Sequence, residues 1–69
     1  MIDYTKLWVL ITLKHINKTQ LRIGASFNSS TLAKLGKNEI VSLEILMKIC
    51  KFLNCDFKDI VEYKGEKNV

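Results

Sequence analysis

The sequence contains no proline, three glycines and only two cysteines in 69 residues. Proline interrupts helices because it has no backbone N–H, so its absence favours unbroken helices. The two cysteines, Cys50 and Cys55, would supply only half of the ligands of a structural zinc site. We therefore expect no metal and interpret both residues as reduced thiols that serve as small apolar core residues.

The sequence also lacks a long apolar run. The longest one extends from Leu7 to Ile11, whereas a helix that crosses a bilayer needs about 20 apolar residues. The N-terminal residues show no signal-peptide pattern. These absences predict a cytoplasmic protein without membrane contact.

Acidic residues are missing from the middle of the chain, although the sequence contains seven of them. All seven lie outside residues 14–37. That segment carries five basic residues, namely Lys14, Lys18, Arg22, Lys34 and Lys37. A positive central third favours binding to a polyanion, although the same side chains could form an ordinary solvated face.

Hydrophobic periodicity predicts five short helices in one domain over residues 1–69, with a core over about 4–61 and a polar tail over 62–69. The first helix is expected over about Tyr4 to His15, capped by Asp3. Tyr4, Leu7, Trp8 and Ile11 share one face of it, so Trp8 is expected in the core. The second is expected over about Gln20 to Ala25, capped by Thr19. The third begins after the capping residue types Asn28 and Ser29 and ends at Gly36.

The fourth helix is expected from Leu43 to Leu53, capped by Ser42. Its apolar stripe comprises Leu43, Leu46, Met47, Cys50 and Leu53. Asp56 and Asp59 resemble a capping box for a last short helix, whose inward-facing residues would be Phe57, Ile60 and Val61.

Some apolar residues exceed what a one-sided helix needs. Val9 and Leu13 lie on the far side of the first helix, and Ile45 and Phe52 lie along one edge of the fourth. These four residues form either a dimer surface or the ordinary core of a small domain that curls round on itself.

The most informative segment runs from Thr19 to Leu35. It places two short helices around a four-residue turn, with apolar anchors at Leu21, Phe27, Leu32 and Leu35. This is the helix-turn-helix layout, in which the first helix crosses the phosphate backbone and the second lies in the major groove.

Over roughly residues 4–61 the sequence resembles the Xre-like family, the phage repressor and Cro type of helix-turn-helix proteins. The strongest matching segments are KTQLR (18–22), FNSSTLAKL (27–35), VSLEIL (41–46) and ICKFL (49–53). The resemblance implies an all-α, compact five-helix, lambda-repressor-like DNA-binding domain. The sequence departs from the family at Arg22, where many members carry alanine, and at Ser26, where the turn usually has glycine.

The resemblance also implies which residues contact DNA, with the recognition helix over about 29–35. Base contacts are expected from Asn28, Ser29, Ser30 and Lys34. Phosphate contacts are expected from Lys18, Thr19, Arg22, Lys37 and Asn38. Lysine donates to guanine O6 and N7, whereas serine hydroxyls discriminate bases weakly, so selectivity should depend mainly on Lys34.

The sequence therefore predicts a transcriptional regulator, most simply a repressor, that binds double-stranded DNA as a homodimer. We expect no cofactor and no small-molecule substrate. We also expect no enzymatic activity, because His15 is the only histidine and lies at a helix end within the basic segment. The alternative is a protein–protein interaction module, antitoxin-like or an adaptor, that uses its basic and apolar surfaces.

Overall fold

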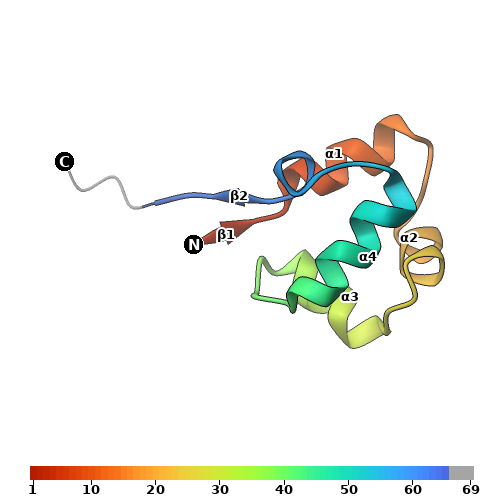
Figure 1. The fold of residues 1–69 in the computed structure, drawn as a ribbon. Helices are drawn as coiled ribbons and strands as arrows, with labels where there is room; N and C mark the ends of the chain where they lie inside the picture. The colour runs from red at the N-terminus through yellow and green to blue at the C-terminus, as the bar shows by residue number, and fades with distance from the viewer. Residues whose placement is uncertain (66–69) are drawn as a thin grey trace.

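Four short α-helices, one 3-10 turn and two very short strands form the protein, which we describe from a computed structural model over residues 1–65 (Figure 1). In chain order the elements are β1 (Ile2–Asp3), α1 (Thr5–Leu13), α2 (Lys18–Gly24), α3 (Ser29–Gly36), α4 (Leu43–Leu53), η1 (Phe57–Asp59) and β2 (Glu62–Tyr63).

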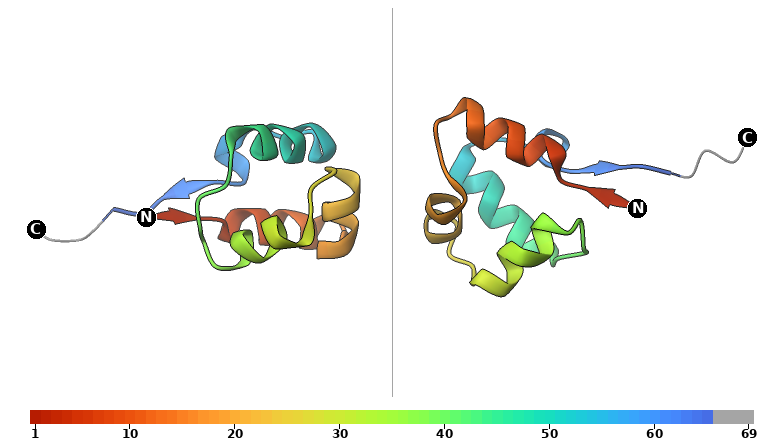
Figure 2. Two further views of the ribbon diagram at one scale, coloured as in Figure 1. Left: turned by 90° about the horizontal axis from the view of Figure 1, so that it is seen from below. Right: turned by 180° about the vertical axis from the view of Figure 1, so that it is seen from behind.

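One apolar core joins all the helices. Each α-helix supplies at least one side chain with no solvent exposure, and η1 is followed by another; they are Leu7, Leu21, Leu35, Ile49 and Ile60. Figures 1 and 2 show α1 and α3 at opposite sides of the molecule, with α4 crossing beside both. The helix-turn-helix is therefore held by the same core that holds α1 and the segment around Ile60.

The start of α1 is tied to the loop after α3. Tyr4 is fully buried, its backbone N–H donates to Asn38 Oδ1 (3.0 Å) and its hydroxyl donates to the Glu39 carbonyl (2.8 Å). Asp3 was expected to cap this helix, but Tyr4 is the N-cap. Asp3 Oδ1 instead accepts from the Thr5 N–H (2.8 Å), so it supports the first turn from one position further out.

The chain is not wholly helical, and the prediction of five helices was wrong. The fifth helix is the single turn η1, although its expected Asp56–Asp59 capping box is present. Glu62 and Tyr63, within the expected polar tail, form β2, which pairs antiparallel with β1 in the register Ile2 with Tyr63 and Asp3 with Glu62. The strands gave no hydropathy signal because backbone hydrogen bonds hold them and both β2 side chains are exposed. Residues 66–69 of that tail lie outside the described residues.

The predicted bounds and cap of α4 are confirmed, since Ser42 Oγ accepts from the Ile45 N–H (3.2 Å). Its buried face was predicted less well. Leu46, Ile49 and Leu53 are buried, whereas Leu43 and Met47 are 66% and 61% exposed. The core therefore meets the helix at a face turned toward Ile49, and one edge of the expected stripe faces solvent.

The prediction that the last turn buries Phe57 was also wrong, because that side chain is 38% exposed while Ile60 is fully buried. Cys50 and Cys55 are free thiols, half-buried against the core. Among residues 1–65, no group of three or more histidine, cysteine or acidic side chains is placed to hold a metal ion. None of the helices in that range has the length and apolar character needed to cross a membrane.

Candidate nucleic-acid interface

The first helix of the helix-turn-helix, α2, begins at a reciprocal capping box. Asn17 Oδ1 accepts from the Gln20 N–H (2.7 Å), and Gln20 Oε1 accepts from the Asn17 N–H (2.8 Å). This pair satisfies two backbone donors at once, so α2 starts at Lys18. The predicted cap, Thr19, was wrong, and it lies exposed in the first turn of the helix.

The turn between α2 and α3 is closed by backbone bonds and one buried ring. The Ser26 N–H donates to the Ile23 carbonyl (3.2 Å) and the Phe27 N–H to the Arg22 carbonyl (3.1 Å). Ser26 adopts a left-handed conformation with φ 59°, which L-residues other than glycine adopt at a cost. Phe27 is 7% exposed, so the turn is fixed relative to the core without a glycine.

The second helix, α3, has the predicted start and end. Asn28 is its N-cap, and Asn28 Oδ1 accepts from the Thr31 N–H (2.8 Å) and from the Ser30 hydroxyl (3.0 Å). Leu35 is fully buried and Leu32 half-buried. The exposed side of α3 consists of Ser29, Ser30, Ala33 and Lys34, so it presents short side chains with one lysine.

The expected base-contact residues therefore lie together at the start and on the outer side of α3. Ser29 and Lys34 are exposed and Thr31 is half-buried. Ser30 and Asn28 are exposed too, but the Ser30 hydroxyl donates a hydrogen bond to Asn28 Oδ1. The Asn28 side chain therefore serves mainly as the N-cap of α3.

The expected phosphate contacts fall into two groups at the two ends of the motif. Lys18 and Thr19 lie at the start of α2, and Lys37 and Asn38 follow α3. Lys18 Nζ lies 4.7 Å from the centroid of the Trp8 ring, a cation–π contact that links α2 to α1. Trp8 itself is half-buried against the core, as expected.

Two of these residues have structural contacts that the sequence did not reveal. The Arg22 guanidinium folds back to the turn, where Nη1 donates to the Phe27 carbonyl (3.4 Å). Asn38 Oδ1 holds the Tyr4 N–H. Both side chains are half-buried, so each supports the shape of the motif whatever else it contacts.

Basic residues of α4 also reach the motif. Lys48 Nζ donates to the Ser26 carbonyl (3.5 Å), and Lys48 and Lys51 line a hollow beside Gly24, Ala25 and Ser26. Sequence reasoning missed them because they lie 22 or more residues from Ser26. The only signal was the presence of lysines on the polar side of α4.

The sequence profile of the Cro/C1-type HTH DNA-binding domain matches residues 6–66, which is most of the chain. The chain belongs to this Cro/C1-type family. A relative from Bacillus subtilis (strain 168), the uncharacterized HTH-type transcriptional regulator YozG, is 31% identical over 62 residues, which cover 87% of this chain and 74% of that protein.

A solved structure supports the same assignment. The crystal structure of the transcriptional regulator VanUg matches with a TM-score of 0.90 and 49% sequence identity, and the match covers 94% of this chain and 87% of that one. The predicted resemblance to the phage repressor and Cro type is therefore confirmed, as is the prediction of a DNA-binding regulator. The matching family model describes a helix-turn-helix DNA-binding domain.

Proposed function

We propose that this Cro/C1-type domain binds double-stranded DNA in a sequence-specific way, with α3 in the major groove, and represses transcription as a homodimer. The observation that carries the proposal is the two-sided character of α3. Leu35 locks one side into the core while the other presents Ser29, Ser30, Ala33 and Lys34 to solvent. A helix that is packed against the core on one side and carries mostly short side chains on the other can approach base edges closely.

Lys34 is the residue through which we expect most of the base selectivity. It projects from the last turns of α3, and its amine can donate to guanine O6 and N7. Ser29 and the Ser30 hydroxyl supply weaker, orientation-dependent hydrogen bonds. Lys18, Thr19 and Lys37 lie at the two ends of the motif, where contacts to phosphates would fix its orientation on the duplex.

Selection of bound duplexes from a random pool followed by matched lysine variants tests the proposal. Lys34→Ala should weaken binding to the selected sequence by about 1–3 kcal/mol and binding to random duplex much less. Lys37→Ala, which removes another exposed lysine just past the helix, should weaken binding to both duplexes equally. Equal losses for Lys34→Ala on both duplexes would contradict base reading by α3.

The homodimer is proposed because two copies of a helix-turn-helix read two half-sites about one helical turn apart. The four residues expected at a dimer surface do not line one hollow: Val9 and Leu13 border one groove, and Phe52 borders another beside Gly24. The fourth, Ile45, is half-buried against the core.

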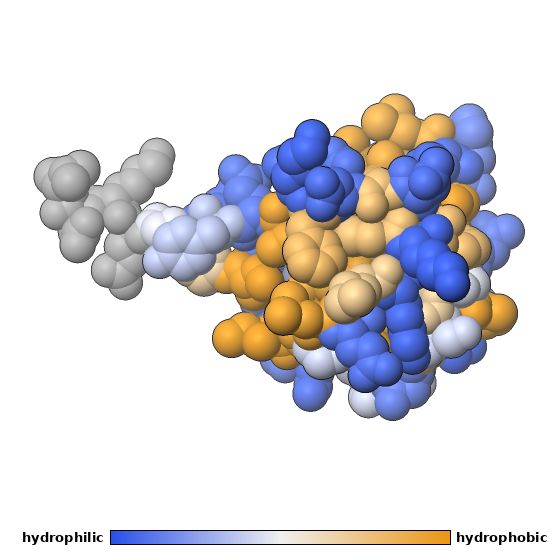
Figure 3. All heavy atoms as spheres, in the orientation of Figure 1, coloured by the Kyte–Doolittle hydropathy of each residue, from blue (hydrophilic) through white to orange (hydrophobic). Residues whose placement is uncertain are grey.

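The apolar surface that best suits a second copy lies at the start of α4. Ile40, Leu43 and Met47 are 80%, 66% and 61% exposed, and apolar surface appears over this end of α4 in Figure 3. Met47→Glu should therefore lower the apparent mass of the complex with a two-half-site duplex in sedimentation experiments, leaving binding to a single half-site unchanged. An unchanged mass would exclude this face.

A further inference from the structure

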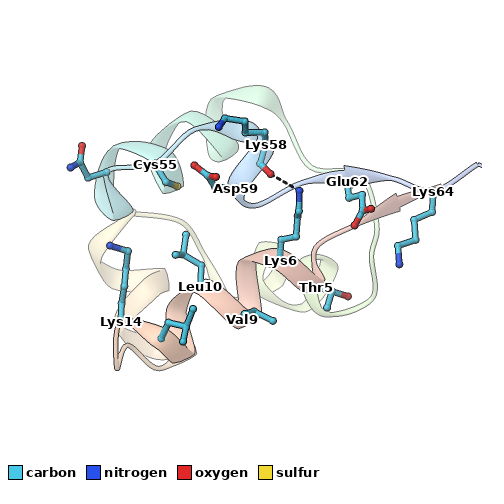
Figure 4. Close-up of a pocket in the computed structure, with 12 residues that line it drawn as sticks. Thr5, Lys6, Val9, Leu10, Lys14, Cys55, Lys58, Asp59, Glu62 and Lys64 are labelled. Carbon is cyan, nitrogen blue, oxygen red and sulfur yellow. Dashed lines mark hydrogen bonds between the residues drawn. The ribbon is translucent and has the colours of Figure 1, made fainter.

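A groove separates α1 from the segment that follows α4, away from the residues proposed to contact DNA (Figure 4). Its volume is about 610 Å³, within the range of about 300–1,000 Å³ typical of ligand sites. The groove lies beside α1 and η1, whereas α3 lies on the opposite side of the molecule (Figure 1). DNA held by α3 would therefore leave the groove open.

Three aliphatic side chains of α1, Val9, Leu10 and Leu13, line the groove and are called its aliphatic floor below. Val9 and Leu13 are 52% and 71% exposed, and Leu10 is half-buried between them and the core. The spacing of Val9 and Leu13 places them one above the other on the same face of the helix. Transfer of such side chains from water into an apolar contact is favourable by about 25 cal/mol per Å² buried.

Charged side chains flank these aliphatic residues, and most of them are basic. The lining of the groove includes four lysines, Lys6, Lys14, Lys58 and Lys64, and two carboxylates, Asp59 and Glu62, so its net charge is two positive. Lys6 reaches across the groove and donates to the Lys58 carbonyl (2.7 Å), which ties its two walls together (Figure 4).

The aliphatic residues and the net positive charge together favour one kind of ligand for the groove over others. A second copy of the chain would bring the same net positive charge, so the two grooves would repel each other. A duplex would meet the lysines but would leave the aliphatic floor uncovered, because its outer surface is phosphate and sugar. An acidic segment with an apolar stripe matches both the aliphatic floor and the flanking basic side chains.

We propose that the groove binds an acidic amphipathic helix of a partner protein. Apolar side chains of that helix at positions i, i+3 or i+4, and i+7 would contact Val9, Leu10 and Leu13. Carboxylates on both flanks would pair with Lys6 and Lys14 on one wall and with Lys58 and Lys64 on the other. The site is separate from the proposed DNA-binding face, so a regulator bound to DNA would recruit this partner at the same time.

A synthetic peptide provides a direct test that does not require DNA. We would titrate the full chain, ¹⁵N-labelled, with a 15-residue helix that carries leucines at i, i+4 and i+7 and glutamates elsewhere. The control peptide has the same composition in an order without helical spacing. The proposal predicts that changes in amide chemical shift are confined to α1 and residues 54–64. It also predicts that the amphipathic peptide binds at least tenfold more tightly than the control peptide.

Two variants locate the contact. Leu13→Asp and Lys14→Glu change exposed residues, and each should weaken peptide binding about tenfold or more. Leu13→Asp should do so without a comparable loss of duplex binding. Lys51→Glu, at an exposed lysine of α4 outside the groove, should leave peptide binding within twofold, apart from a long-range electrostatic effect that added salt screens.

Three results would overturn the proposal. The first is equal binding of both peptides, and the second is equal loss for Lys51→Glu and Lys14→Glu at 0.15 M salt. The third is a dimer that dissociates with Leu13→Asp, since a second copy would then occupy the groove. Failure of duplex binding with intact peptide binding would count against the proposed DNA-binding function alone, so the two failures are distinguishable.

Discussion

Each α-helix of this protein is followed by a residue with left-handed backbone, and none of these residues is glycine. They are His15, Ser26, Asn38 and Asn54, with φ between 54° and 59°. Asparagine tolerates this conformation better than most residues, because its side chain bonds locally. Serine has less of that advantage, so Ser26 carries backbone strain of the order of 1 kcal/mol at the turn that aims α3.

Ser26→Gly should therefore be neutral or stabilise the protein by about 0.5 kcal/mol, because relief of strain offsets the extra entropy of glycine in the unfolded chain. Ala33→Gly, at an exposed helical position, should destabilise it by about 1 kcal/mol. Urea unfolding of both variants measures the difference. Equal losses would show that position 26 is unstrained.

The thiol of Cys50 should react slowly in the native state. Burial raises the pKa of Cys50 to about 11, and the nearby Cys55 thiol adds to this increase in pKa. Because the raised pKa favours the neutral thiol, its contribution to stability is present below pH 9 and is lost between pH 9 and pH 11. Iodoacetamide at pH 8 should label Cys50 roughly a hundredfold faster in urea than in buffer.

A pH series of urea unfolding would check the same point. The wild-type protein should lose more stability between pH 8.5 and pH 10.5 than Cys50→Ala, in which only the Cys55 thiol remains to ionise. Rapid native labelling, or parallel pH curves for the two proteins, would contradict the assignment.

At the scale of elements, α2 and α4 are brought together at a single glycine. A Cβ atom on Gly24 would overlap the ring of Phe52, so the absence of a side chain lets the ring pack closely against α2. Phe52 is 40% exposed, which means that its ring covers α2 from the solvent side. Phe52, which the helical pattern marked as either a dimer-surface or a core residue, therefore packs between two helices of the same molecule.

Gly24→Ala should destabilise the protein by about 1–2 kcal/mol because the ring must move. In a Phe52→Ala background the same change should become neutral or stabilise by a few tenths of a kcal/mol, because alanine favours helix. A double-mutant cycle measured by urea unfolding gives the coupling. Additive effects would show that the ring and residue 24 do not interact.

Local signals predicted some elements well. The bounds of α3 and α4 followed from Asn28 and Ser42, each of which caps its own helix within three residues. The start of α2 was misplaced because Asn17 and Thr19 are both good capping residue types, and only Asn17 has glutamine three positions later.

At the scale of the whole molecule, the features missed from the sequence are contacts between distant segments. Ile2 pairs with Tyr63 through backbone atoms, and Lys48 reaches Ser26 across 22 positions. No periodicity encodes such pairings. The sequence placed the expected DNA-contact residues on one helix-turn-helix motif. It did not predict the hydrogen bonds of the Arg22 and Asn38 side chains, because these depend on turn geometry that composition does not specify.

The fluorescence of Trp8 should change when DNA binds, because Lys18 lies over its ring and is proposed to contact a phosphate. Addition of a selected duplex should change the tryptophan emission, and added salt should reverse the change. Lys18→Met should abolish most of this change in emission. It should also reduce the magnitude of the slope of log K for duplex binding against log salt concentration by about 0.9. Unchanged emission during binding detected by anisotropy would place Lys18 away from the duplex.

The pairing of β1 with β2 has a consequence for how the fold could be rearranged. The Met1 ammonium donates to the Lys64 carbonyl (2.8 Å) and the Lys64 N–H donates to the Met1 carbonyl (2.8 Å), so residues 1 and 64 lie next to each other. A short linker could join them, and new ends could be opened between the exposed residues Lys14 and His15. Such a circular permutant would begin with the helix-turn-helix and finish with α1, while every contact within the core stayed the same.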